Sequence, residues 1–193
     1  MPSRSLLLCL LVWCTGCSME RTRVETSAVV QFPGPDDTLD FWDTLADQPV
    51  ATNNDALHGL ILLHDGDAGI LDSWPQREAR AKAVGWLPAD ATLDPDESAA
   101  AGHLAMAGCA ILDVRGGLSM RLWGRQPRFC LRELVHIGVL PGISEHEALS
   151  GAEFIAFIES LEDRQRVDAA WAHRLQQDEP ARPTDPYAKE DQP

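Results

Sequence analysis

Apolar residues recur at spacings of three and four along most of the chain between residues 54 and 163. This period predicts amphipathic helices that bury one face. The clearest stripe runs from Phe154 to Leu161 and follows a capping box, the helix-start motif, made by Ser150 and Glu153. No segment alternates apolar and polar residues for long enough to indicate a sheet, although residues 29–32 are compatible with a short strand. The pattern therefore predicts an all-α domain.

Helix-start and helix-stop residues divide this region into separate helices. Serine, asparagine and aspartate cap helix N-termini, proline fits the first turn, and glycine ends a helix. The predicted starts are Asn54 or Asp55, Ser73, Ser98, Pro127 and Ser150, and the predicted stops are Gly66, Gly85, Gly116 and Gly138.

Two of the helices end in the same four-residue turn. Gly85-Trp86-Leu87-Pro88 matches Gly138-Val139-Leu140-Pro141, and each turn is followed by a polar loop and another helix. Glycine supplies the left-handed conformation that ends a helix, and proline prevents the helix from resuming. We therefore predict a small bundle of two repeated helix-turn-helix hairpins, at about residues 74–113 and 127–172, plus a leading helix.

The second helix of this repeat has a recognisable opening. Ser150-Gly151-Ala152-Glu153-Phe154 is similar to the Thr-Arg-Ala-Glu motif of the S-layer homology domain, and Ala100-Ala101-Gly102-His103 is a poorer version of it. On these residues the region 54–163 resembles that domain. The resemblance implies helical hairpins, commonly three, that bind cell-wall polysaccharide. The chain lacks the motif arginine at both positions.

An apolar run near the N-terminus predicts export. Arg4 precedes the run from Ser5 to Trp13, which is far shorter than the roughly 20 residues that a membrane span needs. Cys14-Thr15-Gly16-Cys17 resembles the lipobox of bacterial lipoproteins. The resemblance implies that residues 1–16 are a signal peptide and that Cys17 is lipidated and becomes the N-terminus. Ordinary secretion with cleavage nearby is the alternative.

These features predict the location and the layout of the mature chain. We expect an extracytoplasmic protein anchored in a membrane by its lipid, and Ser18 after the cysteine favours the outer membrane in a Gram-negative cell. Residues 17–37 are predicted to form the lipidated N-terminus and a flexible tether, and residues 38–176 the helical domain. The proline- and acid-rich residues 177–193 are predicted to be a disordered tail.

The chain is strongly acidic, and one segment reverses that charge. The net charge is -14, from 16 basic and 30 acidic residues, so nucleic acid is excluded as a partner. No acid lies between Arg115 and Arg132, whereas this segment holds five arginines. Arginine binds carboxylate, phosphate or sulfate. The predicted anion- or partner-binding residues are Arg115, Arg121, Arg125 and Arg128, with Trp123 as an exposed aromatic side chain. Internal ion pairing of these arginines is the alternative.

The remaining cysteines of the mature chain are Cys109 and Cys130. In an oxidising compartment such a pair predicts a disulfide. Two buried free thiols are the alternative.

No motif indicates catalysis. The chain has no nucleophile elbow, phosphate loop, CxxC pair or zinc-spaced histidines, and the acid-rich loops at 65–69 and 90–97 lack the spacing of calcium ligands. We therefore expect no catalytic residue, metal or cofactor, and no enzymatic activity. The favoured function is a membrane-anchored, non-catalytic module of the cell envelope that binds or scaffolds a cell-wall polymer or envelope protein. The alternative is a small envelope-polymer hydrolase or an accessory subunit of an envelope enzyme.

Overall fold

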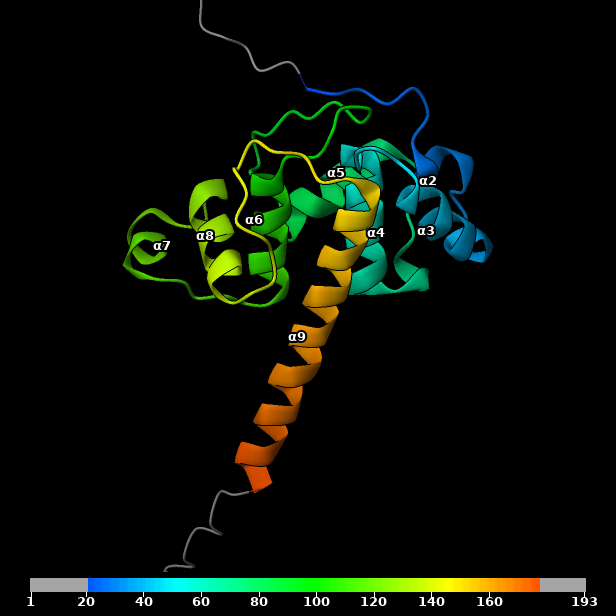
Figure 1. Ribbon diagram of the computed structural model, residues 1–193. Helices are drawn as coiled ribbons and strands as arrows, with labels where there is room; N and C mark the ends of the chain where they lie inside the picture. The colour runs from blue at the N-terminus through cyan, green and yellow to red at the C-terminus, as the bar shows by residue number, and fades with distance from the viewer. Residues whose placement is uncertain (1–20, 178–193) are drawn as a thin grey trace, which may run out of the picture.

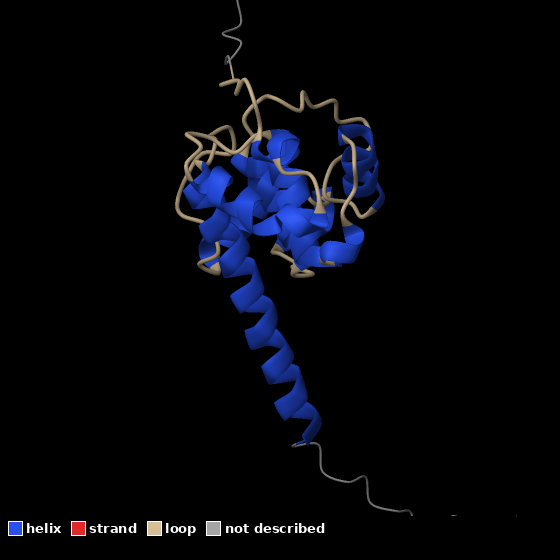
Figure 2. Ribbon diagram, turned by 90° about the vertical axis from the view of Figure 1, so that its right-hand side faces the viewer, coloured by secondary structure: helices blue, strands red, loops and turns tan. Residues whose placement is uncertain are grey.

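A computed structural model describes residues 21–177, which form eight α-helices, two short 3-10 helices and no β-strand (Figure 2). The predicted all-α class is therefore confirmed. The elements are α2 (Ala28–Gln31), η1 (Pro35–Asp37), α3 (Thr38–Ala46), α4 (Asn53–Asp65), η2 (Asp67–Gly69), α5 (Trp74–Ala83), α6 (Ala101–Ile111), α7 (Leu118–Trp123), α8 (Pro127–His136) and α9 (Gly151–Gln177). None of these helices is long and apolar enough to cross a bilayer.

The segments that lead into α4, α6 and α9 are joined by backbone hydrogen bonds. The N–H of Ala51 donates to the carbonyl of Leu149 at 2.9 Å, and that of Ala99 donates to the carbonyl of Ala51 at 2.9 Å. The N–H of Ala101 donates to the carbonyl of Glu147 at 2.8 Å. Because each segment bonds directly to another, the first turns of the three helices meet at one end of the domain.

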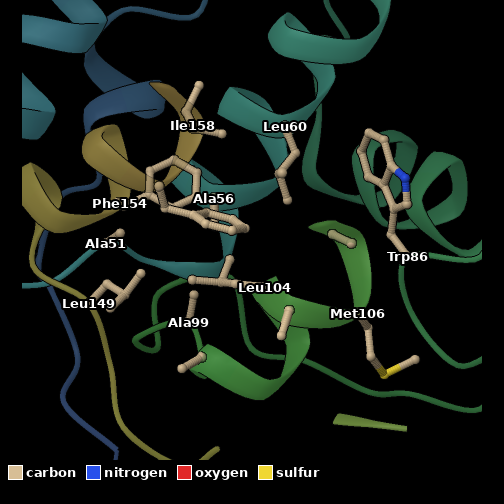
Figure 3. Close-up of a cluster of buried hydrophobic side chains, with 14 of the residues drawn as sticks. Ala51, Ala56, Leu60, Trp86, Ala99, Leu104, Met106, Leu149, Phe154 and Ile158 are labelled. Carbon is tan, nitrogen blue, oxygen red and sulfur yellow. The ribbon is translucent and has the colours of Figure 1, made fainter. Parts of the chain in front are cut away.

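The core forms where these first turns meet (Figure 3). Leu60 of α4, Leu104 of α6 and Phe154 of α9 are all buried there. Trp86, from the turn after α5, is also enclosed. Aliphatic and aromatic side chains of this size each stabilise a fold by about 1.5–3 kcal/mol when they are fully buried. The apolar stripes predicted from the sequence therefore supply the core.

Helices α4 and α9 both begin with reciprocal capping bonds. The N–H of Ser150 donates to the Glu153 carboxylate at 2.8 Å, and the N–H of Glu153 donates to Ser150 Oγ at 3.2 Å, as the sequence predicts. The cap of α4 is Thr52, rather than the predicted Asn54 or Asp55. Asp55 N–H donates to Thr52 Oγ1 at 3.0 Å, and the Thr52 hydroxyl donates to the Asp55 carboxylate at 2.7 Å. The Thr-x-x-Asp spacing is thus a second reciprocal cap, like that of Ser150 and Glu153.

The other predicted helix starts are right in part. Pro127 opens α8, and Ser73 directly precedes α5, but the Ser73 side chain makes no capping hydrogen bond. Ser98 does not cap a helix, because α6 begins at Ala101. The backbone of Ser98 instead donates to the carbonyl of Thr22 at 2.8 Å, which ties the N-terminal segment to the domain.

The two matching turns have the same geometry. Gly85 and Gly138 have φ of 75° and 77°, the left-handed region that favours glycine. In each turn the amide of the next residue, Trp86 or Val139, donates to a carbonyl five positions earlier, at 2.8 and 2.9 Å respectively. The sequence repeat therefore corresponds to a repeated helix end.

The helices pair differently from the predicted hairpins. Helix α5 packs mainly on α4, and α6 packs mainly on α8, whereas α9 lies against α3 and α4. The predicted hairpins, residues 74–113 and 127–172, would instead have paired α5 with α6 and α8 with α9. The loops after the two turns carry the chain across the domain, so that each new helix starts at the common end rather than beside its predecessor.

The predicted tether at 17–37 is partly wrong. Residues 28–31 form helix α2, although the sequence of residues 29–32 is compatible with a short strand. Ala28 and Val29 of this helix are buried in the core. The N–H of Val29 donates to the carboxylate of Asp55 at 2.9 Å. The packed domain therefore begins before residue 38.

Helix α9 projects from the domain (Figures 1 and 2). Its side chains are buried as far as Leu161, and Val167, Trp171 and Leu175 are exposed. The helix ends at Gln177, the first residue of the predicted tail. The rest of that tail, the predicted signal peptide and the lipidation site Cys17 lie outside the described residues.

Candidate binding face of helices α7 and α8

Helix α7 is a short helix in the connection between α6 and α8. Gly116 and Gly124, with φ of 60° and 77°, turn the chain into and out of it. The N–H of Gly117 donates to Glu133 Oε1 of α8 at 2.9 Å, and Met120 is buried. In Figure 1, α7 lies beside α8 at the edge of the domain, on the opposite side from α2 and α3. This placement puts α7 at the periphery of the domain.

The predicted arginines all reach solvent. Arg115, Arg121, Arg125, Arg128 and Arg132 are exposed. Among residues 21–177, Arg125 is the one member of this set with an ion pair, in which its Nη2 atom lies 3.3 Å from Asp113 Oδ1. Internal ion pairing therefore accounts for one of the five arginines, and the other four can bind an external anion.

Trp123 lies within this face, at the C-terminal end of α7. Its side chain is 64% exposed, and its ring centroid is 6.4 Å from that of Phe129. The contact with Phe129 fixes one side of the indole and leaves the other side open. An aromatic surface flanked by guanidinium groups suits a ligand that carries both apolar and anionic parts.

An open groove separates α7 from α8 and the loop that follows Pro141. Its volume is about 770 Å³. Phe129 supplies apolar surface, while Arg132, Glu133 and His136 of α8 supply polar groups. This mixed lining provides cationic hydrogen-bond donors without a set of converging carboxylates.

A second hollow of about 380 Å³ extends the basic surface toward the N-terminal end of the described chain. Arg21, Arg128, His103, His146 and Glu145 line it. Nδ1 of His103 is buried with no hydrogen-bond partner among the described residues. Burial, together with the positive charges of Arg21 and His146, lowers the pKa of His103. This histidine is therefore neutral near pH 7.

Two acids whose pKa is shifted make their contacts away from this surface. Burial raises the pKa of Asp55, whose carboxylate is enclosed by bonds from Val29 and Thr52. Asp65, the last residue of α4, accepts two hydrogen bonds from Arg80 at 2.7 and 2.9 Å, which lower its pKa. Within residues 21–177, no group of histidine, cysteine or acidic side chains is arranged to hold a metal ion.

Sequence reasoning missed a buried polar cluster between α4 and α5. His58 is 1% exposed, and neither of its ring nitrogens has a hydrogen-bond partner in the described part of the chain. Its ring meets that of Phe41 edge to face at 4.6 Å. Arg77 is also buried and donates to Asn54 Oδ1 at 2.9 Å. In the sequence, the position of His58 among the apolar residues of α4 is the signal that could have indicated its burial.

The two cysteines lie side by side where α6 packs on α8. Both are buried free thiols in the structure, and Cys109 Sγ donates to the backbone carbonyl of Cys130 at 3.7 Å. A hydrogen bond with the Cys130 side chain and burial raise the pKa of Cys109. The same hydrogen bond lowers the pKa of Cys130, so Cys130 ionises more readily than Cys109, and the two side chains are neighbours that oxidation could join.

Oxidation is expected to join Cys109 and Cys130 in protein isolated from an oxidising compartment. The bond would close a loop of about 20 residues and stabilise the fold by about 3 kcal/mol through chain entropy. Peptide mapping without reductant should recover the two cysteines in one linked peptide, which reduction separates. Two alkylated thiols in the unreduced, denatured protein would contradict this expectation.

The predicted site residues thus share one face, formed by α7, the start of α8 and the loops around them. Comparison of the chain with models of protein families, with curated proteins and with solved structures found no match.

Proposed function

We propose that the chain is a non-catalytic binding module of the cell envelope, anchored to a membrane by acyl chains on Cys17. In this proposal the arginine-bearing face of α7 and α8 binds an anionic partner. The observation that supports it is the exposure of five arginines, four of which have no ion pair among the described residues. Unpaired guanidinium groups on an otherwise acidic protein are free to bind carboxylate, phosphate or sulfate.

The lipid anchor explains how a protein with a water-exposed fold would remain at the envelope. Each buried methylene of an acyl chain contributes about 0.8 kcal/mol, and two chains hold a protein stably where one does not. The helical domain then stays in water beside the membrane. Its basic face is available to an envelope polymer or to another envelope protein.

The alternative, an envelope-polymer hydrolase or accessory subunit, would need a carboxyl group with a raised pKa in an accessible cleft. Asp55 has a raised pKa, but its side chain is enclosed beneath the N-terminal segment. Each groove beside α7 and α8 carries one carboxylate, Glu133 or Glu145, among arginine and histidine side chains, and Glu133 already accepts the N–H of Gly117. The geometry therefore favours binding over hydrolysis.

Retention of the full chain on immobilised heparin, a soluble polyanion, tests this function. The double variant Arg121→Ala/Arg128→Ala, which removes two of the arginines without an ion pair, should bind roughly tenfold more weakly, because two charge-assisted contacts are lost. Its melting temperature should not change.

The matched control is Arg164→Ala/Arg166→Ala on α9, where Arg164 pairs with Asp168 and Arg166 with Glu162, each at 3.2 Å. This control should keep wild-type retention. Equal losses in both double variants, or no loss in either, would contradict the proposed binding face.

A further inference from the structure

Helix α7 presents apolar side chains to solvent. Met120 is buried and faces the domain, whereas Leu118 and Leu122 are 73% and 63% exposed. These leucines are four residues apart and two from Met120, so they share the opposite side of the helix. With Trp123, this six-residue helix carries three of the eight exposed large apolar side chains of the described chain. Such a cluster on a protruding element indicates an interaction site.

Cationic side chains surround this apolar tip. Arg121 lies within α7, Arg125 follows it, and both are exposed. The bordering acids are occupied, since Asp113 pairs with Arg125 and Glu133 accepts the N–H of Gly117. Helices that lie in the interface of a bilayer combine leucine and tryptophan with flanking arginines. Their guanidinium groups reach the lipid phosphates, while the apolar side chains enter the membrane. A soluble glycan would match the arginines but leave the leucines in water.

The start of the described chain lies beside the same basic surface. Arg21, the first described residue, lines the same hollow as Arg128 at the start of α8. Cys17 is four residues before Arg21. Four residues span at most about 14 Å. Acyl chains on Cys17 would therefore hold the arginine-bearing side of the domain close to the bilayer.

We propose that α7 docks on the anionic lipid surface that holds the anchor, with Leu118, Leu122 and Trp123 entering the interface and the neighbouring arginines binding lipid phosphates. This inference rests on the proposed membrane anchor, because the short link to Cys17 supplies the high local concentration of lipid. Docking would fix the orientation of the domain and direct its other faces away from the membrane.

Quenching of Trp123 by brominated lipids tests the docking. The full chain is purified from membranes and reconstituted in brominated vesicles of phosphatidylcholine, with or without phosphatidylglycerol, and flotation reports anchoring. The fluorescence of Trp123 is obtained by subtracting the spectrum of the Trp123→Phe variant from that of the wild type. In vesicles with phosphatidylglycerol it should lose roughly half of its intensity and shift to shorter wavelength. High salt should reduce the effect.

Trp171 on α9 is the internal control, because it is 56% exposed but lies far along the chain from α7. The fluorescence of Trp171, obtained in the same way with the Trp171→Phe variant, should not be quenched by the brominated lipids. Leu118→Ser/Leu122→Ser should abolish the quenching of Trp123 yet keep heparin retention. Each arginine removed in Arg121→Ala/Arg125→Ala should weaken docking about fivefold.

The outcomes separate the two proposals. Protein that floats with both vesicles while Trp123 stays unquenched would overturn docking and leave the anchor intact. Protein that floats with neither would refute anchoring and docking together. Heparin retention without quenching would show that the arginines serve a soluble polyanion or a protein, and would also overturn docking.

Discussion

Replacing Gly151 with alanine is expected to destabilise the domain by about 3 kcal/mol or more, which lowers the melting temperature by roughly 10 °C. A Cβ atom at this position would lie 1.6 Å from the carbonyl oxygen of Leu45 and 2.7 Å from its carbon. Both are backbone atoms of α3, so no side-chain rotation can relieve the clash. The N–H of Gly151 also donates to the carbonyl of Gln48 at 3.0 Å, which holds the start of α9 in place. Thermal or denaturant unfolding measures the change.

The control is Gly142→Ala, because a Cβ at Gly142 meets no atom within 4 Å and its φ is not in the left-handed region. This variant should stay within about 0.5 kcal/mol of the wild type. Equal stabilities of the two variants would contradict the close approach of α9 to α3.

The same contact gives a physical reason for glycine at this position. Gly151 is the first residue of α9, directly after the capping residue Ser150. Any side chain at this position would collide with the backbone of Leu45. The close contact between α3 and α9 is therefore incompatible with an arginine at this position.

Acidification is expected to destabilise the fold through His58. Burial and the nearby charge of Arg77 lower its pKa from 6.5 to about 4. The unfolded chain then binds a proton that the folded chain rejects, so stability from the neutral imidazole is complete above pH 6.5 and is lost as the pH falls toward 4. The shift corresponds to about 3 kcal/mol. The raised pKa of Asp55 acts in the opposite direction, because the folded state favours its protonated form.

Denaturant unfolding at several pH values measures this loss in the wild type and in His58→Leu. Leucine keeps the packing against Phe41 and removes the titrating group, so the pH dependence between 6.5 and 4 should become much shallower. The exposed control His136→Leu should retain the wild-type slope. A wild-type slope in His58→Leu would show that other groups cause the acid sensitivity.

Much of the fold could be predicted because its signals are local. The stripe from Phe154 to Leu161, the box at Ser150 and the glycine turns each depend on residues close together in sequence. The pairing of α5 with α4 depends on the path of long loops, which no local pattern specifies. The anchoring of α2 depends on the burial of Ala28 and Val29 and on a hydrogen bond from Val29 to a carboxylate distant in the chain. These features became visible only in three dimensions.

The candidate site was predictable in its charge but not in its shape. The spacing of arginines from 115 to 132 is a property of the sequence, whereas their exposure depends on how α7 sits against α8. Leu118 and Leu122 would fit a buried helix equally well, and only the burial of Met120 shows that they face outward. For His58, the sequence gives no sign that both ring nitrogens lack partners among the described residues.

Mass spectrometry of the N-terminal peptide, from the full chain purified out of membranes, tests the central claim most directly. A lipid-anchored module requires Cys17 as the N-terminal residue, with acyl chains on its sulfur, and Cys17→Ser should release the protein from the membrane fraction. An unacylated N-terminus at Ser18 or Met19, or an intact leader on a soluble form, would contradict the account.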